Sequence, residues 1–318
     1  METIIHRKVD VNGISMHVAE KGEGGPVVLL IHGFPELWYS WRHQILGLAA
    51  RGYHAVAPDL RGFGDTDIPP SSSSYTMFHV VGDIVALIHA LGQDKVFVVG
   101  HDWGAIVAWH LCMLRPDKVN ALVNLSVAFT PRNPAQSSIN SLRSHFGDAH
   151  YMVKFQEPGA AEAEFAEIGT ALILKKFLTI RRPNAYILPK ETGFSVSSDD
   201  DLTLPPWLSE EDINYYAAKF EKTGFTGGLN YYRCMELNWE LTAAWTGTQI
   251  KVPTKFIVGD LDLAYHFPGV KDYIHKGGFK KDVPFLQDVV VMEGVGHFIT
   301  LEKAHEVTDH IYDFIKTF

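Results

Sequence analysis

One segment of the chain reads Val96-Phe97-Val98-Val99-Gly100-His101-Asp102-Trp103-Gly104-Ala105, a short apolar run that ends in a turn of small residues. A continuous apolar run of this length is typical of a buried strand, and the apolar residues after the turn favour a helix. A strand, a tight turn and a helix in this order form a nucleophile elbow, where small neighbours tolerate a strained backbone at the apex. The segment therefore predicts that Asp102 projects outward at the top of a sheet.

Further apolar runs are spread along the chain, at 27–31, 54–57, 119–125, 254–258 and 289–292. They are continuous rather than alternating, as expected for buried strands of a parallel sheet that is covered on both faces. Helix-length segments lie between them, including 75–91 with Ser74 as its cap and a terminal segment with apolar residues at 307, 311, 314 and 315. Alternating strands and helices predict an α/β fold with a mostly parallel, doubly wound sheet.

The interval from 130 to 245 breaks this alternation, because helical stretches such as 160–178 dominate it and it has no strand-like run. We interpret it as a mostly helical lid inserted after the run 119–125. Residues 1–129 and 246–318 then form the core domain. A lid at this place would cover the carboxyl edge of the sheet, where open α/β sheets bind ligands.

Composition excludes several classes of function. The 318 residues include 28 Lys and Arg against 37 Asp and Glu, a net charge of −9, which argues against nucleic acid as a partner. No stretch approaches the roughly 20 apolar residues of a membrane span. Cys112 and Cys234 are too few for a disulfide framework or a zinc site and fit a reducing compartment. With no signal peptide or C-terminal targeting tripeptide apparent, we expect a cytoplasmic protein.

An aspartate at the apex of an elbow changes the chemistry that the fold performs. A carboxyl group with an ordinary pKa of about 4 is an anion at neutral pH and needs no base before it attacks carbon. Attack on a saturated carbon gives an alkyl ester, which must then be hydrolysed by activated water. The structural alternative, in which Asp102 only caps the following helix, leaves the small neighbours at 100, 104 and 105 unexplained.

His297 is the candidate base for that second step. It lies in the glycine-rich segment Glu293-Gly294-Val295-Gly296-His297-Phe298, and the order nucleophile, acid, histidine is that of α/β-hydrolases. The acid should follow the run 254–258, where Asp260 and Asp262 both stand. We favour Asp262 as the partner that orients His297, with Asp260 as a turn cap and the remaining alternative. The earlier run ends in Asn124-Leu125-Ser126 and offers no carboxylate.

A third motif, His32-Gly33-Phe34-Pro35-Glu36, follows the run 27–31. Ester hydrolysis passes through an oxyanion that needs converging N–H donors. The backbone amides of Phe34 and Trp103 are placed to supply them, and Pro35 can fix the turn through a cis bond.

Together these motifs, with the segment Phe34 to Arg42, give a chain that resembles the soluble epoxide hydrolases of the α/β-hydrolase fold, above all the plant enzymes. The resemblance implies that two lid tyrosines polarise the epoxide oxygen, and Tyr151 and Tyr232 match their positions. Glu36 matches a carboxylate that positions the hydrolytic water. The resemblance further implies no metal and no cofactor, a small-molecule epoxide and water as the reactants, and fatty-acid epoxides among the substrates.

Tyrosine suits this reaction because the opened epoxide becomes a strongly basic alkoxide. A phenol stays protonated at neutral pH and donates as charge develops on that oxygen. Tyr231 and Tyr232 are neighbours on a predicted helix and point about 100° apart. Only one of them should face the cavity, and Tyr231 is then a packing residue. The aromatic lid favours apolar or aromatic epoxides.

Two other functions stay open at this point. A dehalogenase uses the same aspartate and histidine, but a departing halide needs no proton from tyrosine. A ligand receptor on a hydrolase scaffold has no use for a complete set of catalytic groups. The chain is expected to act as a monomer or a homodimer.

Overall fold

The computed structural model describes residues 4–181, 183–184, 186–188, 193–195 and 202–318. Within them the sheet has eight strands in the order β1-β2-β4-β3-β5-β6-β7-β8. Strands β3 to β8 are parallel, and β1 and β2 add an antiparallel edge. This confirms the α/β-hydrolase fold. The strands are β1 Ile5–Val11, β2 Ile14–Lys21, β3 Val27–Ile31, β4 His54–Pro58, β5 Val96–His101, β6 Val119–Leu125, β7 Thr254–Gly259 and β8 Leu286–Met292.

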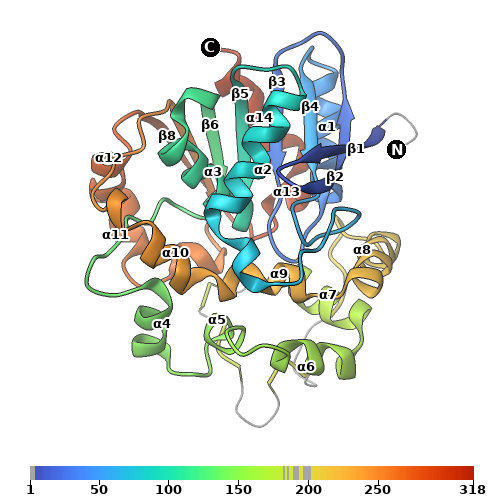
Figure 1. Ribbon diagram of the computed structural model, residues 1–318, viewed down its shortest axis with the longest axis vertical. Helices are drawn as coiled ribbons and strands as arrows, with labels where there is room; N and C mark the ends of the chain where they lie inside the picture. The colour runs from blue at the N-terminus through green and yellow to red at the C-terminus, as the bar shows by residue number, and fades with distance from the viewer. Residues whose placement is uncertain (1–3, 182, 185, 189–192, 196–201) are drawn as a thin grey trace.

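Helices cover both faces of the sheet. In Figure 1, α2 and α3 lie in front of the strands and α1 and α14 lie behind them. The helices outside residues 130–245 are α1 Arg42–Ala49, α2 Met77–Ala90, α3 Trp103–Leu114, α11 Val270–His275, α12 Gly278–Asp282, α13 Ile299–Glu302 and α14 Ala304–Ile315. No helix in the described ranges has the length and apolar character that crossing a bilayer requires.

Three expectations about the sheet and its helices need correction. The N-terminal hairpin β1–β2 was not among the predicted strands, because β1 is mostly exposed and β2, although largely buried, mixes polar with apolar residues instead of forming an apolar run. Strand β8 is only partly buried, since it lies at the edge of the sheet and leaves Val291 38% exposed. Helix α2 is capped by Thr76, whose side chain accepts from the His79 amide, because Ser74 belongs to a short 3-10 turn.

Between β6 and β7 the described residues form helices and one isolated bridge, His150 with Ile187. These helices are α4 Ser138–Phe146, α5 Tyr151–Lys154, α6 Ala160–Ile168, α7 Thr170–Leu178, α8 Glu210–Thr223, α9 Thr226–Arg233 and α10 Met235–Leu241. Figure 1 places them together below the sheet. The predicted stretch 160–178 is two helices, separated where Gly169 takes a φ of 93°. We keep the division into a core of 1–129 and 246–318 and a lid of 130–245 as a proposal.

Candidate active site

Asp102 stands between β5 and α3 with backbone angles of φ 52° and ψ −120°, which confirms the strained apex. The glycines around it are required by close contacts. A Cβ atom at Gly100 would lie 2.5 Å from the carbonyl oxygen of Gly104, and one at Gly104 would lie 2.0 Å from that of Ile31. Larger residues would push the helix away from the strand, so the small residues fix where the Asp102 carboxylate points.

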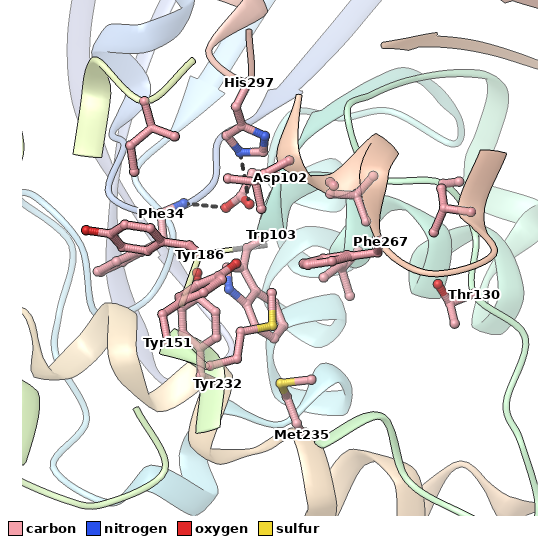
Figure 2. A pocket seen from close by; sticks show the side chains of 18 of the residues that line it. Phe34, Asp102, Trp103, Thr130, Tyr151, Tyr186, Tyr232, Met235, Phe267 and His297 are labelled. Carbon is pink, nitrogen blue, oxygen red and sulfur yellow. Dashed lines mark hydrogen bonds and ion pairs between the residues drawn. The ribbon is translucent and has the colours of Figure 1, made fainter. Parts of the chain in front are cut away.

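Three of the predicted side chains are in contact, with His297 between Asp102 and Asp262. His297 Nε2 lies 3.3 Å from Asp102 Oδ2, and its Nδ1 lies 2.9 Å from Asp262 Oδ1. Asp262 is fully buried and also accepts from the Ala264 amide at 2.8 Å. Figure 2 shows Asp102 between His297 on one side and the rings of Tyr151 and Tyr232 on the other. The arrangement can hold the imidazole in one orientation beside the nucleophile.

The two candidate acids occupy different places. Asp260 Oδ1 accepts from the Val295 amide at 3.2 Å, so this side chain ties the strand end to the segment before His297. The contact with the His297 ring is made by Asp262. The geometry therefore favours Asp262 as the orienting acid and Asp260 as the turn residue.

Donors for an oxyanion lie beside the nucleophile. The Phe34 amide donates to Asp102 Oδ1 at 2.7 Å, and the Phe34–Pro35 bond is cis, as predicted. Trp103 is the first residue of α3, where amides have no acceptor within the helix. One oxygen of Asp102 thus already sits at a donor, and its other oxygen faces His297.

Gly33 packs directly against the nucleophile, and this gives a first prediction. A Cβ atom at Gly33 would lie 2.3 Å from Asp102 Oδ1. Gly33→Ala should displace the carboxylate and slow its alkylation by about 10²-fold, because small misplacements of reacting groups cost that much. Rapid-quench measurement of adduct formation checks this, with melting temperature as the control for folding. A correctly folded variant that alkylates at the wild-type rate would contradict it.

The electrostatics of the site set the protonation of its groups. Burial lowers the pKa of His297, but the Asp262 and Asp102 carboxylates outweigh it and raise that pKa well above its ordinary value. Burial, reinforced by the charge of Asp102, raises the pKa of Tyr151 and Tyr232. Both phenols therefore stay protonated and are hydrogen-bond donors at neutral pH.

The two tyrosines approach from different helices. Tyr151 begins α5, Tyr232 lies in α9, and their ring centroids are 6.2 Å apart. In Figure 2 their hydroxyl ends are directed toward Asp102. Tyr231 turns away and donates to the Arg61 carbonyl at 3.0 Å, so its predicted packing role is confirmed.

Glu36 is fully buried and bonds to a histidine that the sequence analysis did not single out. Its Oε2 lies 2.7 Å from His101 Nδ1 and accepts from the Gly33 amide at 3.0 Å. His101 Nε2 donates to the carbonyl of His297 at 2.8 Å. Burial raises the pKa of Glu36, but the charge and hydrogen bond of His101 outweigh it, so the net shift is downward. A charged pair thus lies behind the nucleophile. The sequence signal that could have identified this pair is His101 itself, a histidine within a predicted buried strand. A buried imidazole needs a hydrogen-bond partner.

A cavity of about 150 Å³ opens onto Asp102, His297, Tyr151 and Tyr232. Residues from inside and outside the 130–245 interval line it together. Most of its walls are apolar or aromatic, including Phe34, Trp103, Phe155, Phe177, Phe267 and Phe298.

One cluster away from this cavity has metal-ligand atoms close together. His17, Asp59 and Asp65 each offer one within 4.8 Å of the others. His17 Nδ1 already bonds to Asp59 at 2.8 Å, and Lys219 Nζ lies 2.5 Å from Asp65. The lysine neutralises the carboxylate that a cation would need, so we do not count this group as a metal site. That the reaction uses no metal or cofactor stays a prediction.

Known proteins resemble this chain over its length. Residues 26–162 match the family model of the alpha/beta hydrolase fold. Epoxide hydrolase 1 of Siraitia grosvenorii is 64% identical over 318 residues, which cover 100% of both chains. A solved epoxide hydrolase of Vigna radiata is 60% identical with a TM-score of 0.94, covering 100% of this chain and 99% of that one. Epoxide hydrolase I of potato, Solanum tuberosum, is 59% identical with a TM-score of 0.95, covering 99% and 100%.

Proposed function

The chain belongs to the epoxide hydrolase family of the α/β-hydrolase fold and is an enzyme that opens epoxides with water; we propose that it does so in two steps, with Asp102 as the nucleophile. The observation that carries this proposal is the line of contacts from Asp102 through His297 to Asp262, at 3.3 and 2.9 Å. A carboxylate needs this arrangement only if the ester it forms is later hydrolysed.

In the first step, Asp102 Oδ2 attacks one carbon of the epoxide. The carbon–oxygen bond of the strained ring breaks, and Tyr151 and Tyr232 donate to the oxygen that leaves as an alkoxide. Their position across the cavity from His297 supports this role. One of the two phenols gives its proton to that oxygen, so the product of the step is an ester of Asp102 that carries a neighbouring hydroxyl group. The tyrosinate left behind is reprotonated in the second step.

In the second step, His297 removes a proton from water, and the hydroxide attacks the carbonyl carbon of the ester. The Phe34 and Trp103 amides hold the oxyanion until the bond to the alkyl oxygen breaks. That oxygen takes the proton from the His297 imidazolium and leaves as part of the diol, and the proton of the regenerated Asp102 carboxyl group returns to the tyrosinate. Esterification removes the charge of Asp102, one of the two carboxylates that raise the pKa of His297. The imidazole therefore becomes easier to deprotonate when a neutral base is required. We propose that Glu36, paired with His101, positions the water; its Oε1 is buried and has no hydrogen-bond partner in the described chain.

This sequence of steps predicts a pH dependence for ester hydrolysis. Its rate should fall as the pH drops through the pKa of His297 in the alkylated enzyme, because an imidazolium accepts no proton. Alkylation does not need the neutral imidazole, so its rate should not show this fall at low pH. Single-turnover kinetics across pH measure the two rates separately.

The same experiment distinguishes the two acids. Asp262→Asn should lose the hydrolysis step by about 10²-fold or more, whereas Asp260→Asn should keep it as the matched control. Equal losses in the two variants, or hydrolysis that ignores pH in the wild type, would contradict the assignment of His297 and Asp262.

The substrates are proposed to be epoxides with apolar, aromatic or fatty-acid substituents. Phenylalanine rings on several sides of the cavity favour such groups by burial. The dehalogenase alternative is disfavoured, because the phenols that face Asp102 serve a leaving oxygen and not a halide.

The setting of the enzyme stays a proposal too. Both cysteines, Cys112 and Cys234, are buried free thiols, which fits a reducing compartment such as the cytoplasm. Monomer and homodimer both remain as oligomeric states.

A further inference from the structure

Ser126 stands where three neighbouring strands end. Strand β6 lies between β5 and β7, and the register pairs Leu125 with His101 on one side and with Ile257 on the other. The residue after Leu125 is therefore level with Asp102 at the carboxyl edge of the sheet. Ser126 is buried and has a φ of 70°, one of three non-glycine residues with positive φ in the described chain. Asp102 is another. Such conformations are costly for a residue with a side chain and tend to persist at functional sites.

The hydroxyl of Ser126 shares its acceptor, the His297 carbonyl oxygen, with two other donors. It bonds to the His297 carbonyl at 3.2 Å, the longest of the three bonds to that oxygen. The His101 ring and the Ile299 amide both donate to the same oxygen at 2.8 Å. A carbonyl oxygen has two lone pairs, so the serine is the donor with the weakest claim on it.

The carboxylate of Asp262, in contrast, has an acceptor oxygen that lacks a donor. Its Oδ1 accepts from His297 and from the Ala264 amide, whereas no donor in the described chain bonds to its Oδ2, which is fully buried. A buried carboxylate oxygen without a donor is costly. Burial raises the pKa of Asp262, but the charge and hydrogen bond of His297 lower it by more. The Ser126 hydroxyl is close enough to add to this lowering. A turn of the hydroxyl toward Asp262 would exchange an acceptor that has three donors for one that has none among the described residues.

We propose that Ser126 is a positioning residue for ester hydrolysis, whose hydroxyl turns from the His297 carbonyl to Asp262 Oδ2 and fixes the carboxylate that orients His297. The proposal rests on the two-step function above. The hydrogen bond would keep Asp262 ionised and hold its Oδ1 toward the imidazole. It would also moderate how strongly Asp262 attracts a proton on His297. Ser126 touches no reacting atom and is not itself a catalytic residue.

Ser126→Ala and Ser126→Gly separate the hydroxyl from the backbone. Both remove the donor, but glycine adopts a φ of 70° without strain and alanine does not. Single-turnover kinetics with a styrene oxide should show alkylation of Asp102 at nearly the wild-type rate in both variants. Ester hydrolysis should be slower by about tenfold in both, as expected for the loss of one hydrogen bond to a charged group.

The pH profile supplies a readout that packing alone would not move. Without the serine, Asp262 is a stronger partner for the imidazolium, so the pKa of His297 in the alkylated enzyme rises. The acid limb of hydrolysis should then move to higher pH in both variants. The proposal is overturned if hydrolysis and its acid limb match the wild type, if both steps slow equally with an unmoved limb, or if only the strained alanine variant is impaired. A wild type that never carries the ester on Asp102 would instead overturn the two-step function, and this role with it.

Discussion

His297→Gln is expected to stop the reaction halfway, with the substrate held as an ester on Asp102. Glutamine can keep a hydrogen bond to Asp262 but cannot take a proton from water. The loss of a general base slows its step by about 10²–10⁴-fold. Alkylation depends on Asp102 and the two tyrosines, so it should proceed. Mixed with a styrene oxide, the variant should gain the mass of the substrate on the peptide that contains Asp102.

The matched control is a second variant, His297→Gln with Asp102→Asn, which should gain no mass because it lacks the attacking carboxylate. An unmodified Asp102 peptide in the single variant, while the wild type turns over the same compound, would argue that water attacks the epoxide directly.

The double variant Tyr151→Phe and Tyr232→Phe is expected to fail one step earlier. The epoxide oxygen would have to leave as an unassisted alkoxide. Removing donors to a developing negative charge costs about 10²–10³-fold each. Stopped-flow or quenched measurements of adduct formation should therefore show almost no alkylation. The size and shape of the cavity are nearly unchanged by the loss of two hydroxyl groups.

Tyr231→Phe is the control that the chain itself provides. Its hydroxyl bonds to the Arg61 carbonyl in the interior, so its loss should lower stability by about 1 kcal/mol and leave alkylation intact. If alkylation kept its rate in the double variant, the leaving group would not need a proton, and the epoxide chemistry proposed for the two phenols would be wrong.

The elbow was predictable because its requirements are local. A buried strand, small residues at fixed positions and the start of a helix lie within ten consecutive residues. The N-terminal hairpin had a local signal too. Asn12 and Gly13 have φ angles of 46° and 81°, as a tight hairpin turn requires, and this residue pair is a strong hairpin marker. The hairpin was not predicted because neither of its strands is a continuous apolar run.

Long-range contacts were beyond the sequence. His101 and Glu36 are in contact although 65 positions separate them in the sequence, and no local pattern around either residue indicates this contact. The choice between Asp260 and Asp262 depended on the turn after β7, which sends one side chain to the Val295 amide and the other to His297. Spacing alone could only favour one of them. The crowding around Ser126 depends in the same way on three strands, β5, β6 and β7, ending side by side.

The central claim is that Asp102 gives one of its own oxygens to the product. One turnover of the wild type in ¹⁸O-labelled water, with enzyme in excess over epoxide, tests this claim directly. The diol of that turnover should carry no label, and the peptide containing Asp102 should become heavier by one ¹⁸O atom. A labelled diol with an unlabelled Asp102 would contradict the account.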